Sequence, residues 1–206
     1  MSNYYDYTRD FPKRCKALLE RNTKLADIDG LEVTLSLTVA AAGIVVPFER
    51  LKSAHPFQSH DRNKEAGKRL TKVLEEPFLT SILWDYSESH SWKYGTLTTE
   101  VVESRTPDNW DNPAPVRSEV GASIVSIIRN ALAHGNLHTW GRTEIEHIIF
   151  VAEHRKGEPP IKIGYRQVRV SPADFRRFLI RWFDFLIDNH MDQEAVGQML
   201  RLVETA

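Results

Sequence analysis

The sequence predicts a mainly α-helical bundle that carries one small β-hairpin, and three observations support this. Apolar residues recur at helical spacing through the first half of the chain. Residues 116–135 form a second amphipathic segment with the same period. Residues 144–170 hold two runs rich in isoleucine and valine on either side of a Gly-Glu-Pro turn, which is typical of a hairpin. A chain of 206 residues is expected to form one domain, here spanning 1–206.

We expect two helices at the start of the chain. The first covers residues 10–22, and the second covers 31–46, with Asp29 as its N-cap and Pro47 as its end. The second helix is apolar nearly all round, which is typical of a buried central helix. Its residues 33–39 alternate between apolar and polar, so a strand is the alternative there.

A third helix is expected over residues 61–83, with a kink or break at Pro77. Residues 85–115 then read as an irregular loop insertion, with short extended or helical pieces near 97–102. Aromatic residues in this loop either stack on single-stranded bases or anchor it to the bundle, and we favour anchoring because a long loop must be fixed. These aromatic residues are Trp92, Tyr94 and Trp110.

The predicted hairpin over 144–170 follows the segment 116–135, with strands at 144–153 and 160–170. Ser171 followed by proline then marks a helix start, because a hydroxyl cap precedes a residue suited to the first helical position. That helix covers 172–189, and a short final helix is expected over 192–203.

Composition excludes several classes of protein. The 27 Lys and Arg residues balance 28 Asp and Glu residues, which argues against a protein that coats nucleic acid but leaves a nuclease with a local basic patch open. The single cysteine, Cys15, cannot form an internal disulfide, as expected in a reducing cytoplasm. Residues 1–14 lack the apolar core of a signal peptide, and the apolar run 39–46 is too short to span a bilayer. We therefore expect a cytoplasmic protein without a membrane partner.

The most informative segment is the predicted helix over residues 116–135, which we call the motif helix. Asn130 and His134 are four residues apart and are therefore neighbours on its polar stripe. Arg129 lies at the border of that stripe, about 140° round the helix from His134. Gly135 is expected to end the helix. The apolar face comprises Val120, Ile124, Ile127, Ile128, Ala131 and Leu132, and the polar stripe adds Ser123 and Ser126.

These three polar side chains suit phosphodiester chemistry. The imidazole of His134 can take or give a proton at a ribose 2′-OH or a leaving oxygen. The guanidinium of Arg129 can form paired hydrogen bonds to phosphate oxygens, and Asn130 can orient either group. No metal is needed if the 2′-OH is the nucleophile. The alternative is that Arg129 and His134 belong to a solvated helix face or a packing pair.

The segment Ile127-Ile128-Arg129-Asn130-Ala131-Leu132-Ala133-His134-Gly135 resembles the signature of the HEPN superfamily (higher eukaryotes and prokaryotes nucleotide-binding). The similarity covers residues 31–186, although only the motif is specific. Within that superfamily the chain is similar to small plasmid- or defence-associated bacterial families.

The resemblance implies an HEPN-like helical bundle and a metal-independent endoribonuclease without a cofactor. Arg129 and His134 would be catalytic, with Asn130 supporting them, at a composite site between two copies of the chain. Cleavage of the RNA substrate by 2′-OH attack would leave a 2′,3′-cyclic phosphate or a related end. The setting implied is a toxin or anti-phage effector, with an antitoxin as a possible partner. Asn136 stands where toxins paired with nucleotidyltransferase antitoxins have a tyrosine, which puts that regulation in doubt.

Further candidates for RNA binding are Ser126 and His138, near the motif, and Arg69 and Lys72, on the basic front of the third helix with Arg62, Lys64 and Lys68. That basic front is more simply a solvated helix face. The histidines, His55 and His60 included, share no metal-ligand spacing, so no metal site is expected. Two alternatives to the enzyme remain: a non-catalytic HEPN module that binds RNA, nucleotide or a partner protein, and a helical structural protein.

Overall fold

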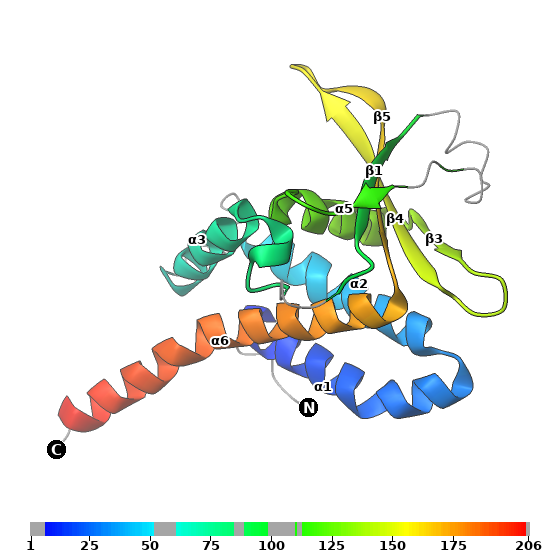
Figure 1. Cartoon of the computed structure of the whole chain (residues 1–206). Helices are drawn as coiled ribbons and strands as arrows, with labels where there is room; N and C mark the ends of the chain where they lie inside the picture. The colour runs from blue at the N-terminus through cyan, green and yellow to red at the C-terminus, as the bar shows by residue number, and fades with distance from the viewer. Residues whose placement is uncertain (1–6, 52–60, 85–88, 99–109, 111–112, 205–206) are drawn as a thin grey trace.

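The computed structural model describes residues 7–51, 61–84, 89–98, 110 and 113–204 (Figure 1). Within these residues the chain forms five α-helices, one 3-10 helix and a five-stranded antiparallel sheet. The helices are α1 (Tyr7–Asp29), α2 (Glu32–Leu51), α3 (Asp61–Glu75), η2 (Phe78–Thr80), α5 (Gly121–His134) and α6 (Pro172–Glu204). The strands are β1 (Lys93–Leu97), β2 (Ala114–Pro115), β3 (Leu137–Trp140), β4 (His147–Lys156) and β5 (Ile161–Val170).

The sheet is larger than the predicted small hairpin. Strands β4 and β5 do form an antiparallel hairpin, but the strand order is β2-β1-β5-β4-β3. Strand β1 comes from the segment expected to be irregular and pairs with β5, while β3 follows the motif helix directly and pairs with β4. The hairpin prediction was therefore too small, because β1 and β2 extend the sheet beyond β5 and β3, from the segment just before the hairpin, extends it beyond β4.

The α1–α2 connection differs from the prediction at both ends. Helix α1 continues to Asp29, and Gly30 at φ 67° reverses the chain, with the Leu31 N–H donating to the Ala26 carbonyl (2.8 Å). Asp29 therefore ends α1 and does not cap α2. Helix α2 also continues through Pro47 to Leu51, so proline does not end it. The alternative of a strand over 33–39 is excluded, because these residues lie within α2.

The elements after α2 meet the predictions in part. Helix α3 ends at Glu75, and Pro77 then forms an isolated β-bridge with Val120, as expected for a break at that proline. The motif helix begins at Gly121 rather than at 116. Two helices were expected after Ser171, but residues 172–204 form the single helix α6. Its start agrees with the prediction, since the Asp174 N–H donates to the Ser171 hydroxyl (3.2 Å).

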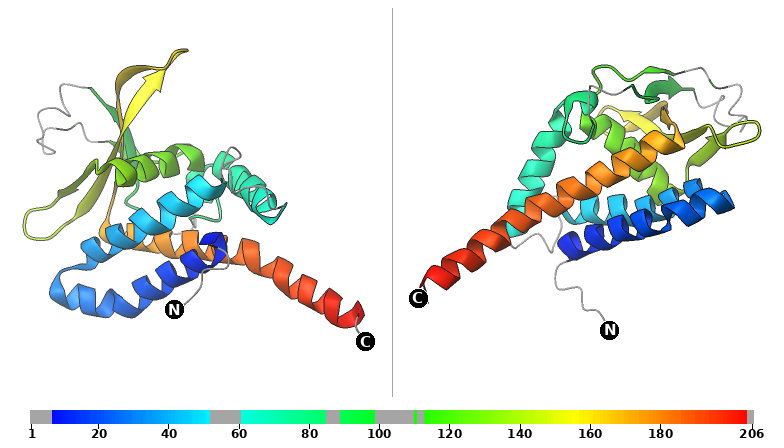
Figure 2. Two further views of the ribbon diagram at one scale, coloured as in Figure 1. Left: turned by 180° about the vertical axis from the view of Figure 1, so that it is seen from behind. Right: turned by 60° about the horizontal axis from the view of Figure 1, so that its bottom comes forward.

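The main core lies between one face of the sheet and the helices α2, α5 and α6 (Figure 2). The sheet contributes Ile148, Phe150 and Ala152 from β4 and Val168 and Val170 from β5, which alternate along their strands as period two requires. A smaller cluster on the opposite face comprises Leu97, Trp110, Ile149 and Val151. Trp110 is buried in it, which agrees with the anchoring role expected for the loop aromatics.

Within the described residues, α2 is the one helix whose length and composition would allow it to cross a membrane. It packs against α1, α5 and α6, and Val39, Ala40 and Ile44 are buried among them. The apolar composition of α2 is therefore accounted for by its place in the core.

Candidate active site

The motif helix α5 is fixed at both ends. At its start, a Cβ on Gly121 would lie 3.3 Å from the Leu74 Cα, so the absence of a side chain lets α5 approach α3. At its end, Gly135 adopts φ 70°, and its N–H donates to the Ala131 carbonyl. Gly135 therefore ends the helix, as predicted. Between these ends the buried face comprises Ile124, Val125, Ile127, Ile128 and Ala131.

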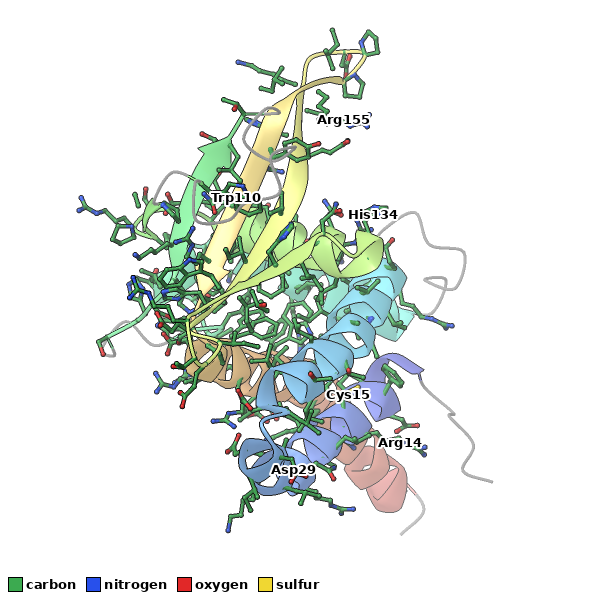
Figure 3. All side chains as sticks on the ribbon, turned by 90° about the vertical axis from the view of Figure 1, so that its right-hand side faces the viewer. Arg14, Cys15, Asp29, Trp110, His134 and Arg155 are labelled. Carbon is green, nitrogen blue, oxygen red and sulfur yellow. The ribbon has the colours of Figure 1, made fainter. Side chains whose placement is uncertain are left out.

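A polar pocket of about 750 Å³ opens at the C-terminal end of α5, and we call it the α5 pocket. Strand β3 pairs only with residues 147–150 of β4, so the rest of β4 runs on past it beside the end of α5. Figure 3 labels His134 at the end of α5 and Arg155 farther along β4 on the same side of the view. The lining residues are Asn130, His134, Asn136 and His138, then Val151, Ala152, Glu153 and Arg155 of β4, and Tyr165 and Arg166 of β5.

Two of the predicted catalytic residues share this pocket. Asn130 is half-buried and His134 is exposed, one helical turn further on, and both line the α5 pocket. The two residues that were predicted to be neighbours on the polar stripe of the helix therefore line the same pocket.

Arg129 faces a different part of the molecule. It forms an ion pair with Glu49 near the end of α2, and its guanidinium lies 5.8 Å from the centre of the Phe48 ring. It also donates a hydrogen bond to the Asn130 side-chain oxygen. It is not among the residues that line the α5 pocket. Among the described residues, Arg129 therefore reaches the α5 pocket only through its hydrogen bond to Asn130, because Arg129 and His134 point to different sides of α5.

His138 lines the α5 pocket and packs edge-on against Trp110, with the ring centres 4.8 Å apart. Burial lowers the pKa of His138 below its usual 6.5, so the neutral imidazole is favoured at neutral pH. The predicted accessory histidine therefore shares a pocket with His134.

The other predicted RNA-binding residues lie elsewhere. The Ser126 hydroxyl donates to the Ser123 carbonyl (3.1 Å), and Ser126 does not line the pocket. Arg69 and Lys72 are exposed on α3, which packs at the Gly121 end of α5 (Figure 1). Thirteen residues of helix place His134 about 20 Å from that end. The structure does not bring Arg69, Lys72 or Ser126 into the α5 pocket.

The charged residues that the sheet brings to the pocket were not among the predicted site residues. Glu153 accepts hydrogen bonds from Arg155 (2.7 Å) and lies 3.8 Å from Lys162. The hydrogen bond from Arg155 holds the pKa of Glu153 below its usual value, with the charges of Arg155, Lys162 and His134 adding to the effect. Arg166 reaches the pocket from β5. Strand periodicity could have placed these residues on a face, but not beside α5.

Within the part of the chain that the structure describes, no group of three or more His, Cys, Asp or Glu side chains could hold a metal ion. His55 and His60 lie outside the described residues. The absence of a metal from the reaction stays a prediction.

A family model described as HEPN pEK499 p136 matches residues 1–193 of the chain. The match includes both motif helix and sheet, and every described element except the last part of α6. No curated protein and no solved structure matches the chain.

Proposed function

Because the chain belongs to the HEPN pEK499 p136 family, we propose that it is a metal-independent endoribonuclease whose active site is the α5 pocket. Membership makes the chain a HEPN module of the nucleotide-binding or RNase type. The proposal of endoribonuclease activity rests on one observation: His134 and Asn130 line one open polar pocket together with arginines from the sheet.

In the proposed reaction His134 accepts the proton of a ribose 2′-OH. The 2′-oxygen then forms a bond to phosphorus, and the bond from phosphorus to the 5′-oxygen breaks. The products are a 2′,3′-cyclic phosphate and a 5′-hydroxyl, whose oxygen takes a proton from water in the open pocket, and His134 then returns its own proton to water. The imidazole of His134 is exposed at the α5 pocket, so it can exchange protons with a substrate bound there.

Asn130 and Arg129 support this chemistry from the helix. Arg129 donates to the Asn130 side-chain oxygen, which fixes the carboxamide so that its NH₂ group can donate toward the pocket. Glu49 in turn holds Arg129. In this arrangement Arg129 acts on the substrate through Asn130, which makes it a positioning residue in the proposed site of one chain.

HEPN domains often act as dimers that bind RNA, and we propose a homodimer here. The α5 pocket is open at the surface of the chain and His134 is exposed, so a second copy can complete the site. The proposed setting is a toxin or anti-phage effector, with an antitoxin as a possible partner. Asn136 lines the pocket without a hydroxyl, so modification of a tyrosine at this position is not available for its control.

The proposal is tested by incubating the purified chain with RNA in excess EDTA. We expect cleavage to persist, with cyclic phosphate ends, and to fall by at least about a hundredfold in His134→Ala, since general acid–base catalysis contributes on that order. Arg129→Ala and Asn130→Ala should also lower the rate. His90→Gln, which lies outside the α5 pocket, is the matched control and should cleave as the wild type does.

Two outcomes would change the conclusion. Cleavage that is unchanged in both Arg129→Ala and His134→Ala would overturn the proposal. RNA binding without cleavage by the wild-type protein would favour the non-catalytic HEPN module instead.

A further inference from the structure

The α5 pocket contains a cation that the motif helix does not supply. Strand β5 pairs with β4 so that Arg166 lies opposite Ala152, which itself lines the pocket. Val168 and Val170 on β5 are buried in the core shared with the helices. Side chains of a strand alternate between faces, so Arg166 lies on the same face as these valines, toward α5.

The guanidinium of Arg166 has an unfilled donor. Its Nε is buried and finds no hydrogen-bond partner among the described residues. A buried donor that loses water without gaining a partner costs about 1–3 kcal/mol. An anion bound in the pocket would supply that partner, and arginine offers two parallel N–H groups to phosphate or carboxylate oxygens.

The carboxylate of the pocket does not neutralise Arg166. Glu153 is held by Arg155, with hydrogen bonds from both Nε (2.9 Å) and Nη2 (2.7 Å), and Lys162 stands 3.8 Å away. The structure gives Glu153 no ion pair with Arg166. Positive charge on Arg166 therefore remains for a ligand.

Arg129, the arginine of the motif, contacts residues outside the α5 pocket. Arg129 is bound by Glu49 and Asn130 and does not line the pocket. Of the two arginines that line the pocket with His134, Arg155 is paired with Glu153, so Arg166 is the one left to meet a phosphate bound there. The pocket volume of about 750 Å³ is within the range of about 300–1,000 Å³ for small-molecule sites.

We propose that Arg166 is the phosphate-binding residue of the α5 pocket and holds a non-bridging oxygen of a single-stranded RNA phosphodiester beside His134. This inference rests on the proposed function, because it names the substrate contact of that same site. The alternative, in which Arg166 is a structural cation satisfied by water, is an outcome of the test below.

The probe is a fluorescent hexanucleotide of 2′-O-methyl RNA, which lacks the 2′-OH nucleophile and so reports binding without cleavage. We expect Arg166→Gln to raise its Kd by about tenfold or more, the loss expected for a hydrogen bond to a charged group. The slope of log K against log salt should fall in magnitude by about 0.7, the contribution of one phosphate contact on a single strand. Arg142→Gln, an exposed arginine outside the pocket, is the matched control and should leave both quantities unchanged.

A second pair of measurements keeps the test decisive if Arg166→Gln folds poorly. Arg166→Lys keeps the charge but loses the paired donors, so it should bind more weakly than the wild type and keep the salt slope. In the wild-type protein, the Nε–H resonance identified by its loss in Arg166→Lys should shift when the hexanucleotide is added.

Binding and salt slope unchanged in Arg166→Gln, or an Nε–H resonance that does not move, would overturn the inference and favour the structural cation. A different result would show that the proposed endoribonuclease function is wrong. The wild type would then bind the hexanucleotide through Arg166 but leave unmodified RNA intact.

Discussion

At the scale of single residues, the motif separates into two environments. Asn130 and His134 face the α5 pocket, while Arg129 turns toward Glu49 and Phe48 of α2. The hydrogen bond from Arg129 to Asn130 is the contact that joins the two environments. A change at Glu49 should therefore reach the pocket through Arg129, although Glu49 does not line it.

We predict that Arg129 and Glu49 are energetically coupled. In a double-mutant cycle with Arg129→Ala and Glu49→Ala, the coupling free energy from urea unfolding should be about 1 kcal/mol, since both side chains are partly exposed (20% and 37%) and screening limits the interaction. The exposed pair of Lys68 and Glu65 is the control and should couple less. Additive effects of the two alanine substitutions at Arg129 and Glu49 would show that the ion pair does not form in solution.

His138 makes stability depend on pH. Burial lowers its pKa in the folded chain, whereas the unfolded chain takes up a proton near the ordinary value of 6.5. The contribution of neutral His138 to the free energy of unfolding is therefore fully present above pH 6.5. It is lost as the pH falls from 6.5 toward the lower pKa of the folded chain. Burial also lowers the pKa of His147, so this histidine changes the stability with pH in the same direction.

The measurement is the free energy of unfolding between pH 7.5 and pH 5.5, the interval about the ordinary pKa of histidine. His138→Phe keeps a ring against Trp110 but cannot titrate, so its stability should decline less steeply than that of the wild type. Identical declines in the two proteins would contradict the assignment.

At the scale of elements, a glycine of α2 faces an aromatic ring of α6. Gly43 of α2 lies where a Cβ would come within 2.4 Å of the Phe183 ring, and Phe183 is fully buried. The Gly43 carbonyl also accepts a hydrogen bond from the Trp182 indole N–H (2.9 Å). The missing side chain thus sets how near α6 approaches α2.

We predict that Gly43→Ala destabilises the fold by about 1–3 kcal/mol, the usual cost of overpacking a core. Helix propensity alone predicts the opposite sign, since alanine is favoured over glycine by about 1 kcal/mol. Urea unfolding measures the sign directly. Adding Phe183→Leu to Gly43→Ala should recover part of the loss, and a stabilised single variant would show that α2 and α6 are less closely packed.

At the scale of the whole molecule, the sheet and the helices meet at the α5 pocket. Helix α5 packs against β4, and the pocket combines residues from α5, from the segment after it, and from β4 and β5. The proposed reaction therefore depends on how the sheet docks on the helices. The proposed dimer adds a second copy of this arrangement.

We predict that activity depends on pairs of chains. Wild-type and His134→Ala protein are co-refolded in varied proportions, and cleavage is measured at constant total protein. If each site requires His134 from both copies, an equal mixture should retain about a quarter of the activity, because only wild-type pairs are competent. A linear dependence, at about half the activity, would show that each chain carries a complete site.

The family pattern and much of the fold were predictable from local sequence signals. Helical periodicity predicted α1, α2, α5 and α6, although their ends in the structure differ from the predicted ends by several residues. The β4–β5 hairpin and the end of α5 at Gly135 followed from turn and cap chemistry. The HEPN resemblance rested on a short motif, and the family match over residues 1–193 confirms it. These features depend on neighbours a few residues apart.

The tertiary structure decided which residues meet. Strand β1 joined the hairpin from a distant part of the chain and β3 from the segment just before β4, because pairing satisfies the backbone hydrogen bonds at each edge of the hairpin. Arg129 turned to Glu49, and Arg166 and Glu153 came to the pocket from the sheet. Periodicity states which face a side chain occupies but not which element covers that face. The sequence by itself therefore determined the elements and the motif, and packing between distant segments determined the composition of the site.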